Sequence, residues 1–225
     1  MTTLSELLHT AIRADHGRNE HSAFMQAIQS GGVAAEGVAG LLARLYPVYR
    51  ELEQTLEVRA REPLLQAFRF PELRRVPSLE QDLAFWYGDQ WQLRLGASAA
   101  ADRYVDRLRR IGEGNGLRLI AHLYTRYLGD LSGGQILQSH LCRLFNRQPQ
   151  DAGVSFWWFE ALPTPAEKVA TKVRFRDALD ALVLSESDLD AIIEEARLAF
   201  ALNRGLLEEL QPAGVAASVT GEVRE

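Results

Sequence analysis

The sequence predicts an all-α protein built as one domain. Apolar residues recur every three or four positions through nearly all of the long segments, which is the period of an amphipathic helix. Convincing alternation of apolar and polar residues, which would indicate strands, is absent. The chain has 225 residues, of which 47% are hydrophobic, so it is long enough to bury one core, and one domain is the default.

Charge and cysteine content exclude several kinds of partner. The net charge of −5 does not favour binding to nucleic acid or to an anionic membrane surface. Cys142 is the single cysteine, so no internal disulfide can form, which fits a reducing compartment. We see no signal-peptide pattern and no uncharged apolar stretch of the ~18 residues that a membrane span needs. We therefore expect a cytoplasmic protein without nucleic-acid or membrane partners, and we expect a monomer.

The first helix is predicted to open with a capping box at residues 3–6 and to run to the Ser-Gly-Gly sequence at residues 30–32. A second helix is predicted over residues 33–59, where Pro47 should kink or split it. Three prolines in residues 60–78 indicate short helices and turns, and Ser78 can cap the helix that follows.

The C-terminal half continues with helical patterns. A helix is predicted over residues 98–111, irregular structure over 147–162, and a helix from Thr164 or Pro165 toward Ala181. Ser185 or Ser187 is expected to cap the last long helix, which Pro212 ends. We expect a domain over residues 1–212 and a poorly ordered tail over 213–225.

Three glycines weaken the helical pattern within residues 124–135, YTRYLGDLSGGQ. Gly129, Gly133 and Gly134 lie within six positions, and each glycine inside a helix costs about 1 kcal/mol relative to alanine. Glycine lets the backbone approach a flat ligand closely, but it also permits a tight helix–helix crossing. Asp130 and Ser132 add polar atoms beside this bare backbone, and a carboxylate would be costly to bury inside a mere crossing.

The last five residues of this stretch, LSGGQ, are identical to the signature loop of ABC-transporter ATPases. That class also needs an α/β sheet and a phosphate-binding loop of the form G-x-x-x-x-G-K-[ST], which the sequence lacks. We therefore reject an ATPase.

His16 is the best candidate for a metal ligand. Glu20 follows one helical turn later and can accept a hydrogen bond from one ring nitrogen, an arrangement that orients a metal-binding imidazole. His9 and Arg13 share this helical face and offer donors to an anionic ligand. The alternatives are an ordinary partly buried histidine and a solvated polar face. Similarly, Lys172 and Arg176 are one turn apart and can pair with carboxylates or form a surface charge row.

The stretch at residues 124–135 closely resembles the distal-helix motif of the heme oxygenases. The segment from His16 to Met25 is similar to the proximal-ligand segment of that family, and residues 193–211 resemble its last core helix. The resemblance covers roughly residues 4–211. It implies a single-domain heme oxygenase-like fold, in which heme b lies between a proximal helix and a glycine-kinked distal helix.

The resemblance also implies roles for individual residues. His16 would ligate the iron, with Glu20 behind it, and Asp130 would anchor a water molecule above the iron. Tyr49, Arg126 and Asn203 would extend this polar network. The remaining residues expected to contact heme are His9, Arg13, Tyr124, Gly129, Ser132, Gly133, Gly134, Lys172, Arg176 and Phe200.

The implied activity is cleavage of heme to biliverdin, CO and Fe²⁺ with O₂ and electrons. The resemblance implies the IXα isomer, and the expected electron donor is a ferredoxin or flavodoxin with its reductase. One alternative is a heme-binding protein that buffers heme without turnover. Another is a related helical protein that handles a different small molecule.

Overall fold

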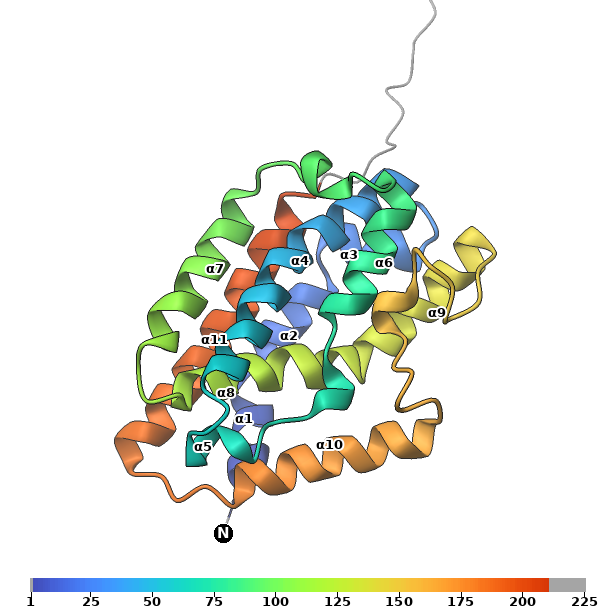
Figure 1. Ribbon diagram of the computed structural model, residues 1–225. Helices are drawn as coiled ribbons and strands as arrows, with labels where there is room; N and C mark the ends of the chain where they lie inside the picture. Colours follow the sequence, from blue (N-terminus) through green and yellow to red (C-terminus); the bar gives the residue numbers. More distant parts are fainter. Residues whose placement is uncertain (1, 211–225) are drawn as a thin grey trace, which may run out of the picture.

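The computed structural model describes residues 2–210, and the fold in this range is helical, without strands (Figure 1). Short 3-10 turns cover Pro71–Leu73, Trp91–Arg94 and Ser155–Trp157, and a π-helical turn covers Tyr124–Leu128. The α-helices are α1 (Leu4–Ala11), α2 (Arg13–Glu20), α3 (Ala23–Gln29), α4 (Ala35–Val58), α5 (Pro63–Gln66), α6 (Val76–Tyr87), α7 (Ala99–Gly112), α8 (Leu117–Leu123), α9 (Gly133–Phe145), α10 (Pro165–Asp180) and α11 (Glu186–Glu208). The predicted all-α, single-domain class is confirmed.

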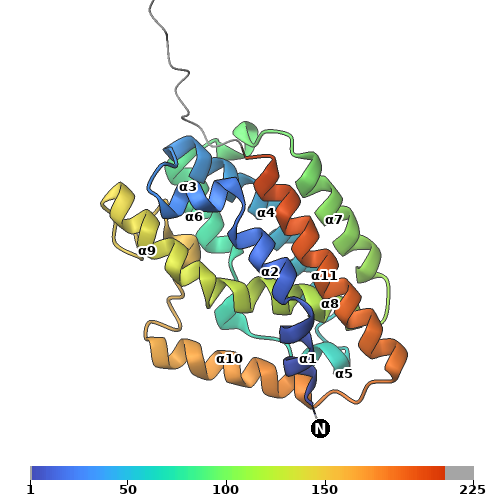
Figure 2. The same ribbon diagram turned by 180° about the vertical axis from the view of Figure 1, so that it is seen from behind.

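Two long helices organise the core. α4 packs against α6 and α7, and α11 packs against α8, α2 and α7. From behind, α2 lies along α11, and α8 and α9 form one long run above α10 (Figure 2). Apolar side chains of all these helices meet in one buried cluster. None of the helices in residues 2–210 is long and apolar enough to cross a bilayer.

The N-terminal segment is three helices and not the single helix predicted. A turn at Ile12 separates α1 from α2, and α2 ends at Glu20. The hydroxyl of Ser22 then caps α3 by accepting a hydrogen bond from the Met25 amide at 3.4 Å. Ser22 is thus a local helix start that the apolar period does not reveal, whereas α2 begins after Ile12 without a side-chain cap.

Pro47 does not split the second helix. α4 is continuous over 24 residues with Pro47 inside it, and the neighbouring Tyr46, Val48 and Tyr49 are buried. Packing on both sides therefore outweighs the hydrogen bond that proline removes. The predicted split is wrong, and the alternative of a kink at Pro47 stays a prediction.

The expected cap at Ser78 is also wrong, because α6 begins at Val76. The buried carboxylate of Glu53, on α4, accepts hydrogen bonds from the backbone amides of Arg75 and Val76 at the start of α6. A side chain distant in sequence thus replaces the local cap.

The C-terminal elements agree better with the sequence. Capping boxes begin α10 at Thr164 and α11 at Ser185, so Ser185 and not Ser187 is the cap. α11 ends at Glu208, and Pro212 and the predicted tail lie outside the described residues. The proposed boundary between domain and tail therefore stays a prediction.

Candidate active site

A cavity lies between α2 and the run from α8 to α9. It encloses about 1040 Å³ of free space, including the part open to solvent. Its lining combines nine apolar side chains and three glycines with nine polar or charged side chains, and such a mixture suits a small organic ligand that carries polar groups. The lining residues are His16, Asn19, Glu20, Met25, Gln29, Leu41, Leu45, Thr125, Arg126, Gly129, Asp130, Gly133, Gly134, Ile136, Leu137, His140, Phe156, Trp157, Phe200, Asn203 and Leu207.

His16 lies on the α2 wall of this cavity. Its Nδ1 atom is 3.4 Å from Oε2 of Glu20, and its side chain is 51% exposed. The Phe200 ring of α11 stands edge-on to the imidazole, with 5.8 Å between ring centroids. Glu20 therefore engages one ring nitrogen and leaves Nε2 free to bind a metal.

The opposite wall is the broken segment between α8 and α9. The chain passes through the π-helical turn and a tight turn before α9 starts at Gly133. A side-chain carbon built at Gly129 or Gly133 would meet nothing within 4 Å. Both glycines therefore leave bare backbone facing open space in the cavity.

Gly134 was expected to contact heme, but the space left by its missing side chain is filled by the protein itself. Gly134 lines the cavity, but a Cβ atom there would lie 2.8 Å from Cδ1 of Trp157. Trp157, and not a ligand, therefore occupies the space that this glycine leaves.

A polar network from three helices surrounds Asp130, which is 5% exposed. The Tyr49 hydroxyl of α4 donates to Oδ2 of Asp130, and Nε of Arg126 donates to the Tyr49 hydroxyl at 3.0 Å. Nη1 of Arg126 donates to Oδ1 of Asn203 on α11. The structure thus brings together all four residues that the resemblance assigned to one network.

Burial raises the pKa of the Asp130 carboxyl, although Arg126 and the hydrogen bond from Tyr49 oppose this effect. Burial also raises the pKa of Tyr49 well above its ordinary value, so the phenol keeps its proton. Asp130 is therefore a carboxyl that holds a proton to higher pH than an exposed aspartate, as expected of a proton-transfer group.

Three of the residues expected to contact heme, Tyr124, Lys172 and Arg176, lie on α10 or beside it. The Lys172 ammonium is 3.3 Å from the Ser132 hydroxyl. Tyr124 is buried, and burial raises the pKa of its phenol while the nearby Arg176 charge opposes the rise. These four residues do not line the cavity itself.

His9 and Arg13 are not brought to the cavity. Both are exposed and absent from its lining. The turn at Ile12 separates His9 from the helix that carries His16, whereas Arg13 begins that same helix. Their proposed contact with a ligand stays a prediction.

Several lining residues escaped the sequence interpretation. Asn19 follows His16 by three positions, and its Nδ2 donates to the Phe200 carbonyl at 3.2 Å. Its Oδ1 has no hydrogen-bond partner, unlike every other buried side-chain polar atom of residues 2–210. Helical spacing from His16 could have identified Asn19, and the aromatic run at residues 156–159 pointed toward Phe156 and Trp157.

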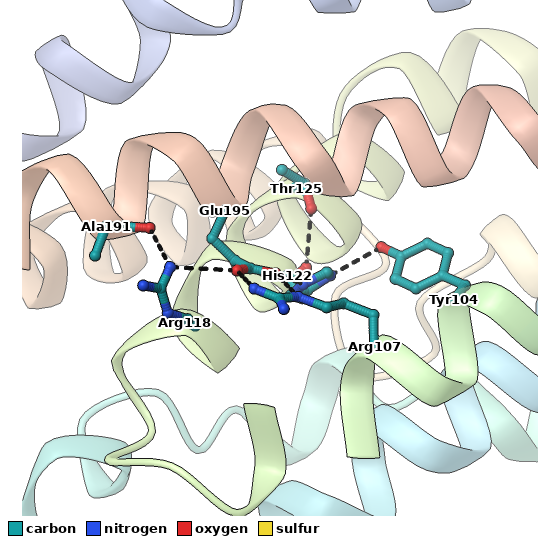
Figure 3. A network of polar contacts seen from close by, with 7 residues as sticks. All are labelled: Tyr104, Arg107, Arg118, His122, Thr125, Ala191 and Glu195. Atoms are coloured by element: carbon teal, nitrogen blue, oxygen red, sulfur yellow. Dashed lines mark hydrogen bonds and ion pairs between the residues drawn. The ribbon is translucent and has the colours of Figure 1, made fainter. Parts of the chain in front are cut away.

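A second polar network joins α7, α8 and α11 (Figure 3). The buried His122 of α8 is 2.9 Å from Oε1 of Glu195 through Nε2 and 3.2 Å from the Tyr104 hydroxyl through Nδ1. Arg107 and Arg118 also pair with Glu195. Burial lowers the pKa of His122, and despite burial the hydrogen bonds from Arg107 and His122 hold the pKa of Glu195 at about 2. Neutral His122 therefore donates from Nε2 to ionised Glu195 and accepts from Tyr104.

Glu195→Gln is expected to lower the free energy of unfolding by about 3 kcal/mol at pH 7, because it leaves buried donors without their charged partner. The folded pKa of Glu195 lies below the ordinary value of 4.5, so its contribution is present above pH 4.5 and is lost as the pH falls toward about 2. The difference from the parent should therefore shrink in denaturant titrations as the pH falls below 4.5. Glu208→Gln, at an exposed ion pair on the same helix, is the control and should stay within about 0.5 kcal/mol. Equal losses in both variants would contradict this role for Glu195.

The protein is thus of the all-α class, with a cavity lined by a histidine on one wall and by glycines on the other. The family model described as heme oxygenase matches residues 2–209. The chain belongs to the heme oxygenase family. It is therefore an oxidoreductase, and heme is both substrate and iron-bearing prosthetic group in this family.

Relatives from distant organisms support this assignment. The chain is 39% identical to heme oxygenase 2 of Synechocystis sp. over 94% of its length and 84% of that protein. It is 39% identical to heme oxygenase 1 of Homo sapiens over 92% of its length and 72% of that protein. The crystal structure of Synechocystis heme oxygenase-2 with heme and NO matches with a TM-score of 0.88 and 38% identity, covering 93% of this chain and 85% of that one. The structure of heme oxygenase from Leptospira interrogans matches with a TM-score of 0.85 and 36% identity, covering 93% and 100%.

The residues of the cavity fit heme. The imidazole of His16 has a free Nε2 atom, the nitrogen that a heme iron binds in many proteins. The open space beside Gly129 and Gly133 gives a flat macrocycle room against the backbone. Apolar side chains such as Phe200 and Leu207 complete the walls.

Proposed function

We propose that this protein cleaves heme to biliverdin, CO and Fe²⁺ with O₂ and externally supplied electrons. The observation that carries the proposal is the buried Asp130 network, which lines the same cavity as His16 from the other wall. A protein that only buffers heme needs an iron ligand, but it has no use for a buried carboxyl with a raised pKa beside the bound ring.

Each wall has its own part in this proposal. His16 holds the iron through Nε2, and Glu20 fixes the orientation of the imidazole. Because Gly129 and Gly133 carry no side chains, the backbone of this wall would lie close against a bound heme and would limit the space above the ring. Asp130 holds a water molecule that delivers protons, and Tyr49, Arg126 and Asn203 fix the carboxyl in place.

Electrons must come from another protein, because heme breakdown consumes more of them than the iron can supply. We propose a soluble ferredoxin or flavodoxin with its reductase as donor, a monomeric enzyme and a cytoplasmic setting. The single cysteine, Cys142, is consistent with a reducing compartment.

The test of function is the absorption spectrum of the purified protein after hemin is added, followed with a ferredoxin system or ascorbate in air. We expect a Soret band at one heme per chain that then decays, with a biliverdin band and release of CO. A Soret band that persists under these conditions would establish a heme carrier and overturn the proposal.

The double variant Lys172→Ala/Arg176→Ala is expected to give a mixture of biliverdin isomers, whereas the parent gives the IXα isomer. We propose that these cations and Tyr124 hold the heme propionates, and so fix which meso carbon faces the bound oxygen. Chromatography of the products measures the isomer ratio. The control is Arg174→Ala, an exposed cation of the same helix that pairs with Glu72. A pure IXα product from the double variant would show that other contacts orient the ring.

A further inference from the structure

The side chain of Gln135 connects three parts of the molecule. Its Nε2 atom donates to the backbone carbonyls of Asp130 and Trp157, both at 2.9 Å. Its Oε1 atom accepts a hydrogen bond from Nζ of Lys168 on α10 at 2.5 Å. The two carbonyls can only accept, so the NH₂ group must face them and the oxygen must face the lysine.

The Asp130 carbonyl needs a partner because the helix is broken beside it. α9 begins at Gly133 with Ser132 as its N-cap, so the carbonyl of Asp130 lies outside the hydrogen-bond ladder of that helix. The Gln135 amide supplies a donor from within the first turn of α9. It therefore fixes the backbone of the residue whose carboxyl the Tyr49 hydroxyl holds from the other side.

Lys168 in turn holds the Gln135 amide. Its ammonium also lies 5.3 Å from the centroid of the Trp158 ring, which restricts its position. One turn further along α10, Lys172 reaches Ser132. α10 is thus tied to the broken distal segment at two successive points, one on each side of Gly133.

We propose that Gln135 and Lys168 are positioning residues for the proton-delivering Asp130. Lys168 orients the amide, the amide holds the Asp130 backbone, and the carboxyl is thereby kept in place toward the cavity. The inference rests on the proposed role of Asp130. It also couples α10, the helix that carries Lys172 and Arg176, to the proton-delivery group on the distal wall.

Gln138 provides a matched control on the same helix. Its Nε2 also donates to two backbone carbonyls, those of Pro149 and Val154, at 2.8 and 3.0 Å, but it makes no contact with Asp130. Gln135→Leu and Gln138→Leu each remove two bonds to backbone carbonyls, and Gln135→Leu also removes the bond from Lys168. Lys168 is partly exposed and can bind water instead, so we expect similar losses of thermal stability. If the two variants differ in the absorption spectrum or in the rate of biliverdin formation, the difference then reflects the position of Asp130 and not a loss of stability.

The experiment measures two properties of the hemin complexes of both variants and of Lys168→Met. The first is the pH midpoint of the change from the acid to the alkaline absorption spectrum, and the second is the rate of biliverdin formation. We expect Gln135→Leu to shift the midpoint by about half a pH unit or more and to slow biliverdin formation about tenfold, because misplaced catalytic groups lose rate steeply. Lys168→Met should act in the same direction with a smaller effect, Lys168→Arg should stay near the parent, and Gln138→Leu should leave both properties unchanged.

Two results would overturn the inference, and they are distinguishable. If the parent cleaves heme and Asp130→Asn does not, while Gln135→Leu and Lys168→Met match Gln138→Leu in both properties, the positioning role is wrong and the proposed function stands. If the parent itself does not cleave heme, the proposed function fails and this inference fails with it. Should Gln135→Leu not fold, Lys168→Met alone decides, because Lys168 is partly exposed and its replacement removes no buried side chain.

Discussion

His16→Ala is expected to abolish heme cleavage, with a loss of more than about 100-fold in the rate of biliverdin formation. Replacing even an outer-shell partner of a metal ligand costs 10- to 100-fold, so removing the ligand itself should cost more. Glu20 would remain but would have no imidazole to orient. The measurements are the absorption spectrum of the hemin complex, which reports the loss of the axial ligand, and the rate of product formation.

His140 offers a control, since it lines the same cavity from α9. Its Nδ1 atom is 2.9 Å from Nη2 of Arg143, and the sequence assigns it no ligand role. His140→Ala should keep the parent spectrum, and added imidazole should restore the parent spectrum of His16→Ala. If His16→Ala kept the parent spectrum and rate, the ligand assignment would be wrong.

Asp130→Asn is expected to lower the rate of biliverdin formation by about 100-fold, within the range that proton-transfer groups contribute. Asparagine is nearly isosteric and can still accept the Tyr49 hydroxyl bond, but its amide does not ionise and so cannot act as an acid or a base. O₂ should then be consumed with less ring cleavage, and oxidation of an added electron donor should rise relative to the parent. Single-turnover spectra under O₂, with CO collected, measure the ratio of the two reactions.

The free energy of unfolding of Asp130→Asn distinguishes a loss of proton transfer from a folding defect. Burial already disfavours the charged form of Asp130, so a neutral side chain should change the free energy of unfolding by about 1 kcal/mol or less. Hemin binding should likewise stay close to that of the parent. A variant that made biliverdin at the parental rate would show that protons reach the oxygen by another route.

Much of the fold was predictable because it depends on local patterns. The capping boxes at Thr164 and Ser185 begin helices where the sequence predicts them. The failures at Pro47 and Ser78 have a common physical cause. In each case contacts from a distant part of the chain, buried neighbours around Pro47 and the Glu53 carboxylate at Val76, outweigh a local preference.

The candidate site divides in the same way. Local spacing in the sequence identified His16, Glu20 and the glycines as candidates, and the structure places them on the walls of one cavity. The network of Tyr49, Arg126, Asp130 and Asn203 was accessible only through resemblance, because its members are separated by up to 154 positions in the sequence. His9 was grouped with His16 by a helical period that the turn at Ile12 interrupts. Arg13 lies on the same helix as His16, but it is exposed and does not line the cavity.

The sequence by itself determined the helical class, a candidate metal-binding histidine at His16, and a segment around residues 129–134 that is too rich in glycine to be an ordinary helix. Helical periodicity and glycine content are properties of neighbouring residues, so they can be interpreted without coordinates. Only the tertiary structure decided what each glycine accommodates. A side chain at Gly134 would collide with Trp157, whereas Gly129 and Gly133 face open space. Packing between segments far apart in the chain makes this distinction, and no local pattern encodes it.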